Sequence, residues 1–189
     1  MDIKNHLSVT SRAALRSWLE AHSETEPFCW VDVTIKKQAG HIQYLDAVEE
    51  ALCFGWIDSV KKKLPDGTLV QRLSPRKKGS HWTELNKERV RRLERLELMT
   101  NSGRRVLPEM DPNTFKVDPK IEQLLKADPN LYQNYLNFPE LYRRVRIDTI
   151  QSYKSQPDLF HRRLEKFLSQ TRENKLYGQW NDNGRLLEE

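Results

Sequence analysis

The sequence predicts an α+β fold: an N-terminal half of helices, strands and a β-hairpin, followed by a helical C-terminal half. Residues 28–35 alternate β-branched and aromatic side chains, which is typical of a strand. Residues 56–75 form two extended runs around a Pro-Asp-Gly turn, which indicates a hairpin. Elsewhere apolar residues recur at spacings of three and four, which favours helices. We expect an α+β domain over residues 1–105 and a helical region over residues 106–189 packed on it.

Local signals mark the ends of the N-terminal elements. Thr10 or Ser11 is expected to cap the first helix, because short hydroxyl side chains accept hydrogen bonds from free helical N–H groups. Gly55 is expected to end the second helix, since glycine enters the left-handed region at little cost. Thr83 opens a third, highly charged helix. The expected order is helix 11–22, strand 28–35, helix 44–56, hairpin 56–75 and helix 83–99.

Only helical signals follow. Thr100–Gly103 is expected to break the charged helix, and prolines over residues 108–119 indicate an irregular linker. Asn137 and Glu140 have the spacing of a capping box, and Tyr153 is expected on the inner face of the helix that follows. The C-terminal helices are expected to begin at Asp118, Asp128, Asn137 and Pro157.

Charge is unevenly distributed along the chain. Residues 1–59 carry five Lys or Arg and nine Asp or Glu, whereas residues 60–105 carry fourteen and five. Residues 106–189 carry thirteen of each. A cluster of one sign attracts partners of the opposite sign, so an anionic small molecule, an acidic protein surface or nucleic acid is expected at residues 60–105. The alternative is that these basic side chains only solvate helix and hairpin surfaces.

The remaining composition predicts a cytoplasmic protein. No stretch approaches the roughly 18 apolar residues of a membrane span. The first twelve residues lack the pattern of an export signal. Cys29 and Cys53 show no paired spacing, which fits a reducing compartment. The oligomeric state stays open.

Several blocks of sequence resemble a known family. They are YLDAVEEALCFGWIDS at Tyr44–Ser59, QRLSPR at Gln71–Arg76, SHWTELN at Ser80–Asn86, MTNSG at Met99–Gly103, and the late segment Arg162–Lys166. Together they resemble the YdeI/OmpD-associated (bacteriocin-protection) family over nearly the whole chain. The resemblance implies a bacterial cytoplasmic protein connected with bacteriocin protection or envelope stress. It implies no reaction and no catalytic residues.

The best candidate surface joins the end of the 44–56 helix to the hairpin. If these elements pack side by side, acidic side chains of the helix are expected to approach Arg72 and Arg76. Arginine binds carboxylate or phosphate in a bidentate manner, and tryptophan covers a flat face. The alternative is that acid–arginine pairs only fasten the hairpin to the helix. The predicted ligand-binding residues are Glu50, Trp56, Asp58, Arg72, Arg76, Trp82 and Asn86.

Other candidate sites are weaker. Cys53 lies between Leu52 and Phe54 without a nearby histidine, which favours a buried apolar role over a nucleophile. Glu49 and Glu50, with Asp46, are compatible with acid–base chemistry or a divalent metal, but a solvated helix face is the favoured interpretation. The five histidines lack metal-ligand spacing, so neither a metal nor a cofactor is expected.

Three functional hypotheses remain. The favoured one is a non-enzymatic protection protein that binds an anionic ligand or partner through residues 60–105. The second is an enzyme that acts on a small polar substrate near Glu50, Asp58 and Arg76. The third is sequence-independent nucleic-acid binding through Lys61–Lys63, Arg76–Lys78 and the arginines of the 83–99 helix.

Overall fold

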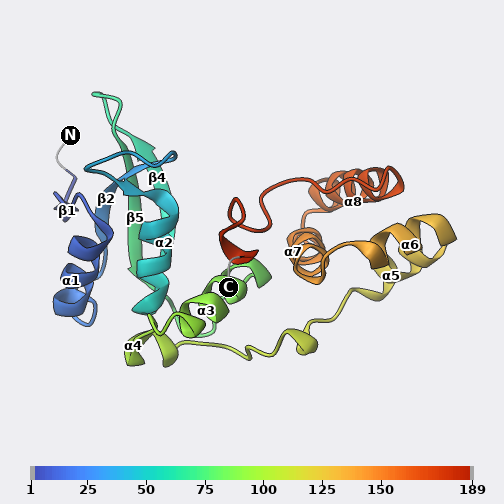
Figure 1. Cartoon of the computed structure of the whole chain (residues 1–189), viewed down its shortest axis with the longest axis horizontal. Helices are drawn as coiled ribbons and strands as arrows, with labels where there is room; N and C mark the ends of the chain where they lie inside the picture. The colour runs from blue at the N-terminus through green and yellow to red at the C-terminus, as the bar shows by residue number, and fades with distance from the viewer. Residues whose placement is uncertain (1–2, 188–189) are drawn as a thin grey trace. The chain divides into compact units, whose positions relative to one another are not determined.

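The computed structural model describes residues 3–187, which group into two compact units. One unit comprises the chain up to His81 together with Arg89–Pro108, and the other comprises Trp82–Glu88 and the chain from Glu109 onward. Within the described residues all strands belong to the first unit, and the second is helical (Figure 1). The predicted α+β class is therefore confirmed.

The first unit is built on a mixed sheet. Its strands are β1 (His6–Leu7), β2 (Cys29–Thr34), β3 (Ile42–Gln43), β4 (Trp56–Lys63) and β5 (Leu69–Pro75). The order is β1-β2-β5-β4, and β3 also pairs with β2. The predicted hairpin β4–β5 is antiparallel, β5 pairs antiparallel with β2, and the two-residue strands β1 and β3 run parallel to β2. β2 is thus the central element of the sheet.

Alternation along β2 gives the sheet two different faces. Cys29, Val31 and Val33 are buried on one face, on which α2 (Tyr44–Cys53) packs, with α1 (Arg12–His22) beside it. Trp30 points to the opposite face, where its cross-strand partner is Arg72. We call this second face the outer face and define it by Phe28, Trp30, Lys62 and Arg72.

Most predicted helix ends are confirmed. Ser11 Oγ accepts a hydrogen bond from Ala14 N at 3.1 Å and caps α1. Thr83 Oγ1 accepts one from Asn86 N at 3.2 Å, where α3 (Glu84–Arg95) begins. Gly55 has a φ of +75° directly after the C-cap Phe54 of α2. Helix α2 ends at Cys53, as a stop at Gly55 requires, and Trp56 begins β4 instead of continuing the helical face.

The segment expected to break the charged helix is itself helical. Thr100 caps a one-turn helix, α4 (Asn101–Arg104), because its Oγ1 accepts a hydrogen bond from Gly103 N. The same hydroxyl donates to the Cys53 carbonyl oxygen at 2.6 Å, and Thr100 N donates to that oxygen at 3.1 Å. This contact fastens α4 to the free C-terminal end of α2, where carbonyl groups lack helical partners.

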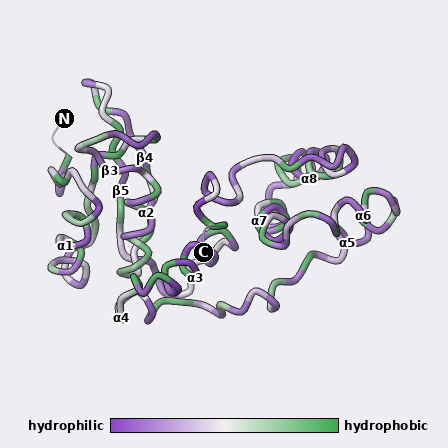
Figure 2. Tube along the Cα trace, in the orientation of Figure 1, coloured by the Kyte–Doolittle hydropathy of each residue, from purple (hydrophilic) through white to green (hydrophobic). Residues whose placement is uncertain are grey.

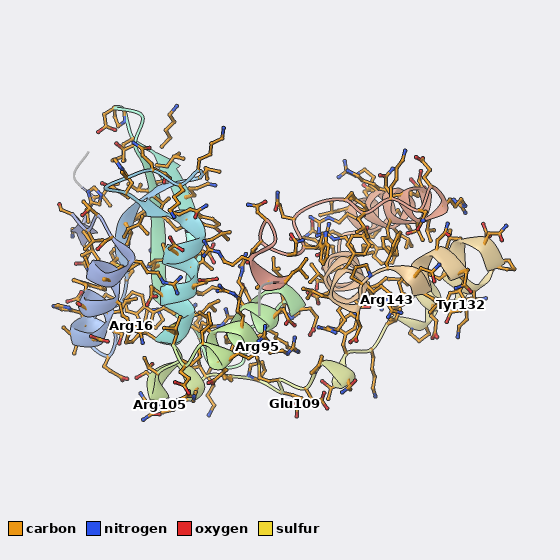
Figure 3. All side chains as sticks on the ribbon, viewed as in Figure 1. Arg16, Arg95, Arg105, Glu109, Tyr132 and Arg143 are labelled. Carbon is orange, nitrogen blue, oxygen red and sulfur yellow. The ribbon has the colours of Figure 1, made fainter. Side chains whose placement is uncertain are left out.

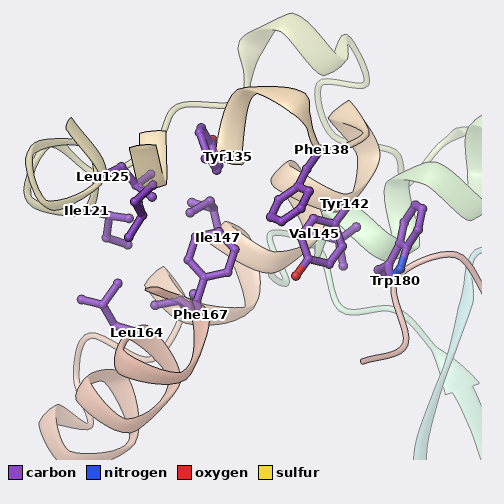
Figure 4. Packing of buried hydrophobic residues seen from close by; sticks show 12 residues of the cluster. Ile121, Leu125, Tyr135, Phe138, Tyr142, Val145, Ile147, Leu164, Phe167 and Trp180 are labelled. Carbon is purple, nitrogen blue, oxygen red and sulfur yellow. The ribbon is translucent and has the colours of Figure 1, made fainter. Parts of the chain in front are cut away.

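The second unit contains a separate apolar core. Its helices are α5 (Pro119–Lys126), α6 (Pro129–Asn137), α7 (Glu140–Gln151) and α8 (Pro157–Arg172). Tyr142 and Phe167 are fully buried in this core (Figure 4). The expected capping box is wrong: Pro139 is the N-cap of α7 and no side chain caps it. Tyr153 lies beyond the end of α7 instead of on its inner face.

Hydrophobic and hydrophilic residues are mixed along the helices of both units (Figure 2). Within residues 3–187, no helix is long and apolar enough to cross a membrane.

We expect Gly103→Ala to destabilise the first unit. An added Cβ would overlap the Cys53 carbonyl oxygen and lie 2.8 Å from its carbon, so the backbone must move. Overpacking of this kind lowers the free energy of unfolding by roughly 1–3 kcal/mol. Urea denaturation measures the change. Asn101→Ala in the exposed part of the same helix is the control and is expected to change the value by less than about 0.5 kcal/mol.

Candidate functional site

The predicted adjacency of helix and hairpin is confirmed, because α2 packs against both β4 and β5. The glutamates of α2, however, contact arginines that lie outside the hairpin. Glu50 accepts hydrogen bonds from Arg12 Nε at 2.5 Å and Arg16 Nη1 at 3.0 Å. Glu49 accepts from Arg12 Nη1 at 2.7 Å and Arg92 Nη1 at 3.1 Å. These five residues form the buried charge cluster of the first unit, with Arg16 reaching it from α1 (Figure 3).

The buried charge cluster contradicts the interpretation of these acids as a solvated helix face. Glu49 and Glu50 are each only 1% exposed. Burial alone would lower the pKa of Arg12, but the adjacent Glu50 and Glu49 carboxylates outweigh it and raise that pKa. Burial and Glu50 oppose each other in the same way at Arg16, whose pKa is also raised. The arginines therefore stay charged, and Glu50 already has its ligands within the protein.

Trp56, Asp58 and Arg76 are also held by protein contacts. Trp56 is 1% exposed, and its Nε1 donates to the Ser23 carbonyl oxygen at 3.1 Å. Asp58 accepts a hydrogen bond from Tyr44 Oη at 2.7 Å. Arg76 is buried, and its Nη2 donates to the His81 carbonyl oxygen at 2.7 Å. Burial lowers the pKa of Arg76, against the attraction of Asp58.

The other predicted residues separate into two groups. Trp82 is buried and Asn86 belongs to the first turn of α3, and both lie in the second unit. Arg72 lies on the outer face of the sheet, in the first unit. The role of the seven residues in ligand binding stays a prediction.

Cation–π pairs organise the outer face. The Cζ atom of Arg72 lies 4.6 Å from the Phe28 ring centroid, and Lys62 Nζ lies 5.0 Å from that of Trp30. These distances follow from the strand register, which places Trp30 opposite Arg72 and Lys62 opposite Val70. A cation over an aromatic face is attracted by the negative centre of the ring. The outer face therefore holds its positive charges next to its rings.

A pocket of about 560 Å³ opens at this face. We call it the outer-face pocket, and it is lined by Ile3, Lys4, Phe28, Trp30, Lys62, Lys63, Leu64 and Pro65. None of its lysines forms an ion pair with a carboxylate of the described residues, and neither does Arg72. Asp32, the acid on the same face of β2, is already engaged by His6 at 2.6 Å. The pocket thus combines apolar walls with unneutralised positive charge.

Sequence reasoning missed Lys4, Phe28 and Trp30 as site residues. The alternation of residues 28–35 already places Phe28 and Trp30 on one strand face, and the run Lys61–Lys63 marks the basic strand. What the sequence did not indicate is that β5 joins the hairpin to β2 and so brings the two signals together.

Both cysteines are buried and free, which confirms the burial predicted for Cys53. Burial raises the pKa of Cys29 to about 12. Burial, reinforced by the charge of Glu50, raises the pKa of Cys53 to about 12. Neither thiol is therefore a nucleophile near neutral pH.

We expect Glu50→Gln to lower the free energy of unfolding by roughly 3–5 kcal/mol, because removing one partner of a buried ion pair leaves uncompensated charge. Glu20→Gln is the matched control: Glu20 also pairs with Arg16, at 3.6 Å, but its side chain is 57% exposed. The control is expected to cost less than about 1 kcal/mol. Equal effects in urea denaturation would show that the buried charge cluster contributes little to stability.

We expect neither thiol to react with Ellman's reagent at pH 8 in the native protein, and both to react in denaturant. The cause is the raised pKa of both buried thiols. Between pH 9 and about 12 the unfolded chain loses thiol protons that the native protein keeps, so these groups lower stability as pH rises. Rapid native labelling would contradict this expectation.

Two family models match separate parts of the chain. Residues 7–106, more than half of the chain, match a family described as a domain of unknown function (DUF8412). Residues 114–174 match the family described as bacteriocin-protection, YdeI or OmpD-associated. No curated protein and no solved structure matches the sequence.

The second match confirms the family resemblance, but it lies mostly on other residues than the sequence blocks that suggested it. Of the blocks that carry the resemblance, only Arg162–Lys166 lies within residues 114–174, and the others lie within residues 7–106. The bacteriocin-protection relationship is thus carried by the helical part of the chain. The chain therefore belongs to the DUF8412 family, whose model covers residues 7–106, and its residues 114–174 carry a match to the bacteriocin-protection, YdeI or OmpD-associated family.

Proposed function

We propose that this bacteriocin-protection-type protein acts by binding an anionic ligand on the outer face of its sheet. The observation that supports it is a set of cations at one pocket that form no ion pair within residues 3–187: Lys4, Lys62 and Lys63, with Arg72 beside them. Surface lysines are commonly paired or dispersed, whereas these converge on a concave surface. A concave site with one sign of charge raises the local concentration of counter-ions of the opposite sign.

The proposal places the ligand against part of residues 60–105, the basic block of the chain. Lys62, Lys63 and Arg72 belong to residues 60–105, whereas Lys4, Phe28 and Trp30 come from the acidic N-terminal segment. Part of the acidity of that segment is neutralised internally, because Glu49 and Glu50 pair with arginines in the buried charge cluster. That cluster uses Arg12, Arg16 and Arg92, and none of the outer-face cations belongs to it.

The enzyme hypothesis finds less support. It requires Glu50, Asp58 and Arg76 to converge on a substrate, but Glu50 is buried against two arginines and Asp58 is hydrogen-bonded by Tyr44. Arg76 donates to a backbone carbonyl group. These contacts give each of the three side chains a structural partner, which favours ligand binding at the outer face over catalysis here.

We also propose a cytoplasmic location. The support is chemical: two cysteines stay as buried free thiols, a state that a reducing compartment maintains.

Titration with tripolyphosphate at low ionic strength tests the proposal. We expect measurable binding to the full chain by isothermal calorimetry. The double variant Lys62→Gln/Lys63→Gln is expected to weaken binding about tenfold, which corresponds to roughly 1.4 kcal/mol. The reason is the loss of two lysines that line the outer-face pocket.

Lys77→Gln/Lys78→Gln is the matched control. It removes the same charge from exposed positions of the same basic block, outside the pocket lining. The control is expected to bind tripolyphosphate within about twofold of wild type, since neither lysine lines the outer-face pocket. Equal weakening by both variants, or no binding by wild type, would overturn the proposal.

A further inference from the structure

We propose that the outer-face pocket takes an organic acid with an apolar body, whose acid group pairs with the lysines of the pocket. This inference rests on the proposed function and specifies the class of ligand. Its basis is the juxtaposition of apolar walls and unneutralised lysines in one pocket.

The walls of the pocket require an apolar body. Ile3, Phe28, Trp30, Leu64 and Pro65 supply five of the eight lining residues. A purely polar anion would leave this surface in contact with water and gain nothing from it, whereas an apolar body gains about 25 cal/mol for each Å² that it buries. The volume of about 560 Å³ suits one small organic molecule, because ligand pockets commonly measure about 300–1,000 Å³.

The lysines require an acid group close to that body. Lys62 Nζ lies 5.0 Å from the centre of the Trp30 ring, so the charge is adjacent to the apolar wall. An anion held by Lys62 is therefore attached to the apolar body directly or through a short spacer. Lysine is a compact point charge without the fork geometry of arginine, so the pocket accepts carboxylate, sulfonate or phosphate groups.

A single-stranded nucleic acid fits this face less well. Stacking of successive bases needs open aromatic faces. Trp30 is only 7% exposed and has Lys62 over its ring, while Arg72 covers Phe28. The geometry therefore favours a compact ligand over an extended chain.

Calorimetric titration of the full chain with 2-naphthoate tests the inference. 2-Naphthamide, which has the same flat body without charge, is the matched ligand control. We expect naphthoate to bind at least tenfold more tightly than naphthamide. Lys62→Gln/Lys63→Gln is expected to remove that difference, whereas Lys77→Gln/Lys78→Gln is expected to preserve it.

A second variant tests the apolar wall. Leu64→Ser reduces the apolar lining at the hairpin end and leaves every cation in place. We expect it to weaken naphthoate several-fold and to leave tripolyphosphate unchanged. Circular dichroism confirms that each variant is folded.

The outcomes separate this inference from the proposed function. One outcome is that tripolyphosphate binds at the lysines while naphthoate binds no more tightly than naphthamide and keeps its affinity in Leu64→Ser. That result excludes the organic acid as the ligand and leaves the proposed anion binding in place. If neither probe binds, both proposals fail. Tighter binding of a thymidine oligonucleotide than of naphthoate would overturn the inference in favour of nucleic acid.

Discussion

The alternation of side chains along the central strand β2 determines how the first unit is organised. One set of residues, including Cys29 and Val31, completes the core beneath α2. The other set places Phe28 and Trp30 on the outer face, where lysine and arginine side chains from the hairpin meet them. Because the period of a strand is two residues, a shift of register by one position would exchange the two faces. The core and the outer face therefore both depend on the register of β2.

Much of the fold was predictable because its signals are local. Ser11, Gly55 and Thr83 marked helix ends through hydrogen bonding and backbone freedom, which depend on a few neighbouring residues. The two-residue strands β1 and β3 are too short to show any period. The helix α4 was missed because its stability depends on the carbonyl oxygen of Cys53, which is distant in sequence.

The candidate site was less predictable than the fold. The sequence identified Arg72 as a ligand-binding residue and the hairpin lysines as part of a basic surface, but it grouped Arg72 with Glu50 and Trp56, which are buried. Adjacent acids on a helix resemble a solvated face until the arginines that bury them are known, and Arg12 and Arg92 are separated from them by about forty residues. Pairings across such separations follow from topology, which periodicity does not encode.

The buried charge cluster also has a consequence for how the family can diverge. Arg12 contacts both glutamates, and each glutamate binds a second arginine of its own. Exchange of either glutamate removes a buried carboxylate that two arginines share, so a single replacement there passes through a destabilised intermediate sequence. We therefore expect the five positions to change together in relatives, so that all are kept or all are exchanged for apolar residues. Correlated substitution at these positions would show the coupling.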